Sequence, residues 1–209
     1  MSKYATFVFD DGPNQYLCSM VDKFKSFGFT AAFAIIGRQI NDNTEPMLKY
    51  AIDNGFELLS HGQRHKGLGQ TQDRQEILDE IMPPIEEVEK RLGYKISIIR
   101  TAFLSYNDQI HEITKELKYP LMGCGFGGGR DWADETTPES IANSVLSSIE
   151  DGDVGCLHVT KNTLAALDTI LPELKNRGYI LTTPTELFKI KGIENIPIGL
   201  PVDNFNDFI

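Results

Sequence analysis

The feature that most constrains the fold of this chain is a regular alternation of short apolar runs with longer amphipathic segments. Seven runs have the length and the content of β-branched and aromatic residues that are typical of buried strands. They cover residues 5–9, 30–36, 57–60, 96–99, 121–123, 154–157 and 179–182.

Helical patterns separate these runs. The clearest covers residues 73–92, and we expect its interior pair Pro83-Pro84 to bend or divide it. Two further patterns cover residues 138–149 and 164–176. Strands that alternate with helices indicate a parallel sheet with covering helices. Because the chain has no dinucleotide-binding fingerprint, we predict an α/β fold, namely a distorted (β/α) barrel, complete or incomplete, with about seven parallel strands.

Composition limits the class of protein. The 209 residues are 41% hydrophobic and 24% charged, which predicts a single globular domain over residues 1–209 with 197–209 as the one candidate appendage. A net charge of −10 argues against a nucleic acid or an anionic membrane as partner. The three cysteines are too few for a disulfide framework, and the N-terminus lacks a secretory signal.

From these two features we expect a cytoplasmic protein, or a secreted one if a leader was trimmed. Its oligomeric state is not predicted.

Polar and ionisable residues follow five of the predicted strands. In a barrel of parallel strands these ends lie on one face, where such folds build their active sites. The residues are Asp10, Asp11, His61, His65, Arg100, Asp131, Trp132 and His158.

Two of these residues have the spacing of metal ligands. In a helical turn, His61 and His65 of the segment SHGQRH would point the same way. Two histidines and one carboxylate form a common ligand set for catalytic zinc. One aspartate of the pair Asp10-Asp11 would then bind the metal and the other would act as general base. The alternatives are exposed loop histidines and an ordinary Asp-Gly-Pro turn.

The remaining groups fit supporting roles in the same reaction. Arg100 can hold the base ionised and oriented. His158 can deliver a proton to a leaving group, while Asp131 orients it and raises its pKa. Trp132 fits either the core or the lining of a substrate pocket beside these groups, and we expect the second.

At this level of detail the chain resembles the polysaccharide deacetylases, carbohydrate esterase family four. All five motifs of that family occur in order between about residues 6 and 187, as VFDDG, HGQRH, RTAF, Asp-Trp and CLH. The resemblance implies that Asp10 is the general base and that Asp11, His61 and His65 are the metal ligands. It also implies a distorted (β/α) barrel, in agreement with the alternation above.

For the other motifs the resemblance implies that Arg100 orients the base and that His158 is the general acid. The backbone N–H of Phe103 would help to hold the oxyanion. Cys156 stands where the family has a leucine that packs with the tryptophan around the acyl methyl group. Because Cys156 and His158 are two residues apart on one strand, their side chains should face the same side.

The chain departs from the family pattern at five positions. Val8 replaces a threonine, Gly62 a hydroxyl residue, Ala102 a proline, Phe103 a tyrosine and Cys156 a leucine. None of these changes removes an ionisable group. We expect Gly62 to loosen the loop that carries the histidines.

These observations predict a hydrolase that removes an N-acetyl or O-acetyl group from an amino sugar, oligosaccharide or polysaccharide. The predicted cofactor is one divalent metal ion, zinc first, with cobalt, nickel and manganese as alternatives. Two other functions stay open: a catalytically weakened glycan-binding protein on the same scaffold, and a metal amidohydrolase of a non-sugar amide.

Overall fold

The computed structural model describes residues 2–194 and 196–209. Within them the strands are β1 (Lys3–Gly12), β2 (Ala32–Ile35), β3 (Glu57–Ser60), β4 (Leu121–Met122), β5 (Phe126–Gly127), β6 (Val154–His158), β7 (Tyr179–Leu181) and β8 (Pro201–Val202). The α-helices are α1 (Leu17–Ser26), α2 (Glu45–Asp53), α3 (Arg74–Ile81), α4 (Pro83–Leu92), α5 (Asp108–Leu117), α6 (Pro138–Ser148), α7 (Lys161–Asn176) and α8 (Pro184–Ile190). The short 3-10 helices are η1 (Gly37–Gln39), η2 (Ala102–Leu104) and η3 (Phe205–Phe208).

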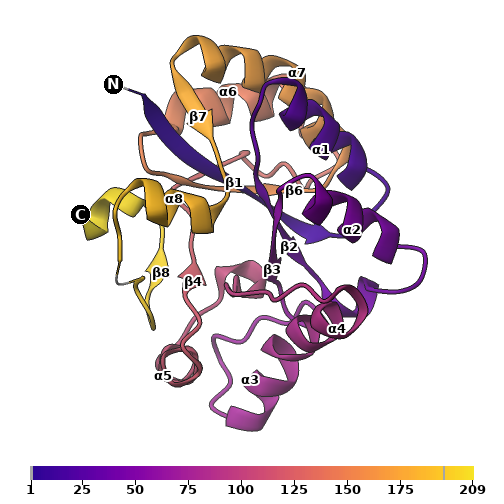
Figure 1. The fold of residues 1–209 in the computed structure, drawn as a ribbon, viewed down its shortest axis with the longest axis vertical. Helices are drawn as coiled ribbons and strands as arrows, with labels where there is room; N and C mark the ends of the chain where they lie inside the picture. The colour runs from indigo at the N-terminus through magenta and orange to yellow at the C-terminus, as the bar shows by residue number, and fades with distance from the viewer. Residues whose placement is uncertain (1, 195) are drawn as a thin grey trace.

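Strand β1 organises the main sheet, whose order is β3-β2-β1-β6-β5. Its first residues pair with β7 and its later residues with β2, while β6 runs beside it from Thr6 to Asp10. All of these pairs are parallel. Figure 1 shows β1 crossing the middle of the molecule with helices arranged around the strands. The predicted α/β class and parallel sheet are confirmed.

The barrel is distorted and is not closed by continuous strand pairing. The predicted strand at 96–99 is reduced to single parallel bridges that join Ile99 to Ser60 and to Leu121. Beyond it, β4 and β8 form a separate two-stranded sheet, and β4 is joined to the rest by the single bridge at Ile99. The prediction of a full fourth strand was therefore wrong, although the ladder hydrogen bonds around Ile99 keep Arg100 at the end of a strand-like segment.

Two apolar cores hold the strands in place. The larger lies between the strands and the helices and includes Phe7 and Phe9, whose rings each meet the Phe24 ring edge to face. The smaller contains alternate residues of the same strands, such as Val8, and Phe205 of the C-terminal segment. This alternation is what places Asp10, two residues after Val8, on the same side of β1 as the smaller core.

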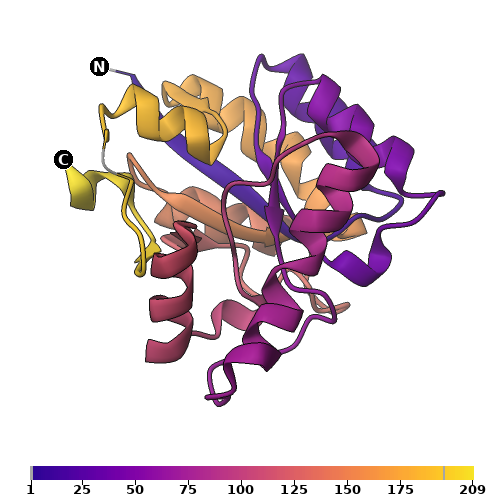
Figure 2. The same ribbon diagram turned by 60° about the horizontal axis from the view of Figure 1, so that its bottom comes forward.

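The C-terminal segment is part of the barrel, so its interpretation as an appendage was wrong. Phe205 is fully buried against Phe188 of α8, with ring centroids 4.6 Å apart. Figure 2 shows the segment running beside α5. The pairing of β8 with β4 and the packing of Phe205 on Phe188 both depend on residues far away in the chain. For this reason no local sequence pattern predicted them.

The helix predictions are confirmed. The pattern at 73–92 forms two helices that part at Met82-Pro83, because a proline at the start of α4 cannot continue the hydrogen bonds of α3. Asp73 caps α3, and Thr137 caps α6. Over the described residues no helix combines the length and the apolar character needed to cross a membrane.

Candidate metal centre and active site

The residues predicted from the strand ends surround a single cavity of about 540 Å³. It is lined by Asp10, Asp11, His61, His65, Phe103, Leu104, Trp132, Cys156 and His158. Arg100 and Asp131 lie directly behind this lining, where each contacts one of its charged members. The structure thus brings together all ten side chains that were singled out from the sequence.

Asp11, His61 and His65 offer three ligand atoms that all lie within 4.8 Å of one another. The Oδ1 atom of Asp11 is 3.0 Å from Nε2 of His65 and 3.5 Å from Nε2 of His61. That Oδ1 atom is buried and has no hydrogen-bond partner. A buried carboxylate oxygen without a donor is costly unless a cation neutralises it, so the donor set fits a divalent metal ion.

A backbone hydrogen bond on the side away from Asp11 orients the His61 ring. Its Nδ1–H donates to the backbone carbonyl of Arg100 over 2.8 Å. This bond fixes the tautomer and leaves the lone pair of Nε2 facing Asp11, as is typical of metal-binding histidines. Burial raises the pKa of Asp11, but the neighbouring His61 and His65 rings outweigh this effect and leave that pKa well below its usual range.

Asp10 is held by a buried ion pair. Nε of Arg100 lies 2.9 Å from Oδ1 of Asp10 and 3.1 Å from Oδ2. Arg100 is fully buried, and its Nη1 also donates to the carbonyl of Gly123. Asp10 is therefore paired with the Arg100 guanidinium and fixed next to Asp11, on the wall of the same cavity.

His158 faces Asp10 across the β1–β6 pair, where the two residues are in register. Its Nδ1–H donates to Oδ1 of Asp131 over 2.8 Å, while Oδ2 of Asp131 accepts from the His158 backbone and from the Thr163 hydroxyl, both at 2.7 Å. Burial lowers the pKa of His158, but the hydrogen bond and charge of Asp131, with the charges of Asp10 and Asp11, raise it by more. The ring is thus poised to carry a proton on Nε2, toward the cavity.

Strained backbone concentrates at the site. Six non-glycine residues of the described chain have positive φ, and four of them line the cavity: Asp11, His65, Phe103 and Leu104. Such conformations cost on the order of 1–3 kcal/mol each, and they persist only where the surroundings enforce them. Phe103 and Leu104 of η2 are two consecutive left-handed residues in the wall of the cavity.

Aromatic side chains form the rim. Phe103 is 69% exposed and Trp132 56% exposed, and the Phe103 ring lies against His65 with centroids 4.4 Å apart. Cys156 lies deeper, with its sulfur 3.5 Å from Oδ2 of Asp10. Cys156 and His158 do face the same side, as their spacing predicts.

Several contributing residues escaped the sequence analysis. Thr163 lies in the first turn of α7, and nothing in the sequence indicated its contact with Asp131. Cys124 contacts Cys156, a contact that lowers the pKa of Cys124 and, with burial, raises the pKa of Cys156. Glu80 is buried beside the histidine loop, and one signal was present: it is an acid on the apolar stripe of α3, between Ile77 and Ile81.

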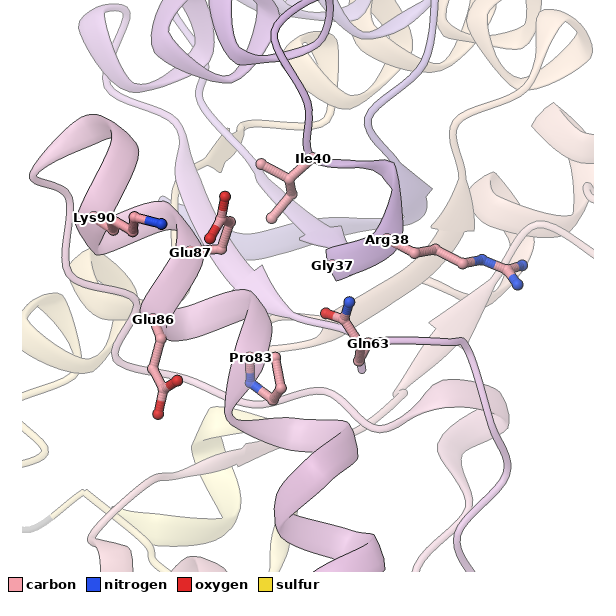
Figure 3. A pocket seen from close by; sticks show the side chains of 8 residues that line it. All are labelled: Gly37, Arg38, Ile40, Gln63, Pro83, Glu86, Glu87 and Lys90. Carbon is pink, nitrogen blue, oxygen red and sulfur yellow. The ribbon is translucent and has the colours of Figure 1, made fainter.

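A second cavity lies outside this site, between η1 and α4 (Figure 3). Glu87 and Lys90 of α4 lie toward Ile40, whereas the Glu86 side chain points away, and Gln63 of the histidine loop lies below Gly37. It is lined by charges of both signs, and its described lining contains no buried polar atom without a partner. We therefore assign it no chemistry.

Comparison with known proteins agrees with this geometry. The polysaccharide deacetylase family profile matches residues 1–122. A peptidoglycan-N-acetylglucosamine deacetylase of Bacillus cereus is 30% identical over 195 residues, which cover 90% of this chain and 90% of that protein. A bifunctional xylanase/deacetylase of Pseudobutyrivibrio xylanivorans is 29% identical over 91% of this chain, which spans only 31% of that protein.

Solved structures show the same fold. The Xyl-CE4 domain of a multidomain xylanase, from the hindgut metagenome of Trinervitermes trinervoides, superposes with a TM-score of 0.90 at 26% identity and covers 99% of both chains. A family 4 acetyl xylan esterase from Clostridium thermocellum, in complex with a cobalt ion, has a TM-score of 0.88 at 26% identity over 97% of this chain and 99% of the other. The fold and site define a carbohydrate-esterase type of (β/α) barrel. The chain belongs to the polysaccharide deacetylase family.

Proposed function

We propose that this chain is a metal-dependent deacetylase that hydrolyses an N-acetyl or O-acetyl group on a glycan. One observation carries the proposal: the three candidate ligands Asp11, His61 and His65 surround the same cavity as the buried Asp10 carboxylate and the His158 ring. The named activities of the relatives, on peptidoglycan and xylan, support the choice of a glycan.

Asp11, His61 and His65 would hold the metal ion. When bound, a divalent ion there acts as a Lewis acid that makes water more acidic and polarises the acyl oxygen. Zinc suits a site with two imidazoles and one carboxylate, and the cobalt in a structural neighbour supports a site open to other divalent ions.

The chain's own groups complete the reaction. Asp10, held by Arg100, takes the proton of the attacking water. The N–H of Phe103 donates to the oxygen that becomes negative in the tetrahedral intermediate. His158 gives its Nε2 proton to the departing amine or alcohol, and Asp131 stabilises the charged ring.

The cavity also suits a sugar ring. Its volume of about 540 Å³ is within the usual range for small-molecule sites and accommodates about one sugar unit with its acetyl group. The exposed faces of Phe103 and Trp132 at the rim offer apolar surface to the sugar, while Cys156 lies deep enough to contact the acyl methyl.

Acetate release tests the proposal. The purified protein, stripped with EDTA and reloaded with zinc, cobalt, nickel or manganese, is assayed on N-acetylglucosamine oligomers, peptidoglycan, acetylated xylan and acetanilide. We expect metal-dependent acetate release from at least one glycan, and its loss in Asp10→Asn. Turnover of acetanilide alone would favour the non-sugar amidohydrolase. Glycan binding without acetate release under every metal would favour the weakened, glycan-binding protein.

A further inference from the structure

Glu80 is a buried carboxylate that the reaction above does not use. It lies on α3, is 1% exposed, and occupies a position between two buried isoleucines where an apolar residue would be expected. Burying a carboxylate is expensive unless its oxygens are hydrogen-bonded. We therefore expect the oxygens of Glu80 to accept hydrogen bonds from nearby donors.

The partners of Glu80 all belong to the loop that carries the metal-binding histidines. Its Oε1 accepts the backbone N–H of Arg64 over 2.7 Å and the backbone N–H of Lys66 over 3.0 Å. Its Oε2 accepts from Nε of Arg64 over 3.0 Å. The two amides lie on either side of His65, so a single carboxylate oxygen fixes the backbone before and after this ligand.

The shape of the loop matches this arrangement. His65 has φ 60°, a left-handed conformation that needs external support. Gly62 has φ +84°, and a Cβ there would lie 2.9 Å from Oε1 of Glu80. The backbone carbonyl of Glu80 also accepts the N–H of Gln63 over 2.7 Å. Gly62 leaves the room that the Glu80 carboxylate occupies, and the hydrogen bonds of Glu80 oppose the loosening that we expected from this glycine.

We propose that Glu80 is a positioning residue that holds the 62–66 loop so that Nε2 of His65 faces Asp11, and that it thereby sets the affinity for the metal ion. This inference rests on the proposed metal-dependent function. Glu80 touches neither metal nor substrate, and it acts only through the backbone of the loop.

Two substitutions of similar volume separate the hydrogen-bonding role from packing. Glu80→Gln keeps an oxygen that can accept both backbone amides, whereas Glu80→Met fills the space without an acceptor. Arg64→Ala removes the ion pair but leaves the backbone bonds. Asp79→Ala alters the neighbouring, exposed acid of the same helix and is the matched control.

Metal affinity of the apo protein is measured by calorimetric titration with Zn²⁺. Loss of groups that orient metal ligands typically weakens affinity about 10–100-fold, and we expect a loss of this size in Glu80→Met. Affinity within about threefold of wild type is expected for Glu80→Gln, Arg64→Ala and Asp79→Ala, because the backbone bonds survive. Hydrogen exchange of the Arg64 and Lys66 amides in the metal-free proteins should accelerate only in Glu80→Met.

The outcomes are distinguishable. Wild-type protein that binds no Zn²⁺ would refute the proposed metal function and with it the effect on affinity, while the exchange data would still report on the loop. Normal affinity in a folded Glu80→Met would overturn the inference, as would equal losses in Glu80→Met and Glu80→Gln. If Glu80→Met does not fold, Gly62→Ala replaces it: the added methyl displaces Oε1, so unchanged affinity in that variant would overturn the inference.

Discussion

The buried ion pair between Asp10 and Arg100 is the interaction whose removal should have the largest measurable effect. Arg100→Met would leave the Asp10 carboxylate, only 3% exposed, without a counter-charge and would also free the carbonyl of Gly123. Removing one partner of a buried pair costs roughly 3–5 kcal/mol of unfolding free energy. For a domain of this size we expect the melting temperature to fall by about 2–4 °C per kcal/mol, or roughly 6–20 °C.

A double-mutant cycle shows whether the effect belongs to the pair. Asp10→Asn with Arg100→Met removes both charges, so we expect the double variant to regain about 2 kcal/mol relative to Arg100→Met. The unfolding free energy is measured in urea with EDTA present, so that metal binding does not contribute. Far-UV circular dichroism is the suitable signal, because the single tryptophan, Trp132, is half exposed in the folded state. Activity should stay lost in the double variant, since the base is absent.

Two results would refute this reasoning. A loss below about 1 kcal/mol in Arg100→Met would place the pair among exposed ion pairs of little value. A double variant no more stable than Arg100→Met would show that the arginine stabilises the fold by packing rather than by countering the charge of Asp10.

Three further predictions concern the site. His65→Ala should lose most of its metal in elemental analysis, and equal metal content in this variant and wild type would remove His65 from the ligand set. Asp10→Asn should keep its metal but lose about two to four orders of magnitude in kcat. Asp131 raises the pKa of His158, and the proposed mechanism uses the protonated ring, so Asp131→Asn should move the alkaline limb of the kcat/KM profile to lower pH. An unmoved limb would mean that another group titrates there. Cys156→Leu should raise the preference for N-acetyl over N-propionyl substrate by up to about tenfold, and an unchanged ratio would show that Cys156 does not touch the acyl group.

Local patterns were sufficient for the central strands and for the positions of the charged groups. A buried parallel strand has a continuous apolar run, and the polar residues that follow it must lie at the carboxyl edge of the sheet. For this reason the neighbourhood of Asp10, His61 and His158 followed from their places after three such runs. The split of the 73–92 helix likewise followed from a property of proline alone.

The tertiary structure decided what depends on contacts between distant segments. Strands β5 and β8 are two residues long and exist only because neighbouring strands pair with them. Three contacts join segments that lie far apart in the sequence, so no local pattern could predict them. They are the burial of Phe205, the hydrogen bond from Thr163 to Asp131 and the hydrogen bonds of Glu80 to the histidine loop. A residue's type and spacing determine which chemistry it can perform, whereas its hydrogen-bond partners across the fold determine whether it is held in the geometry that this chemistry requires.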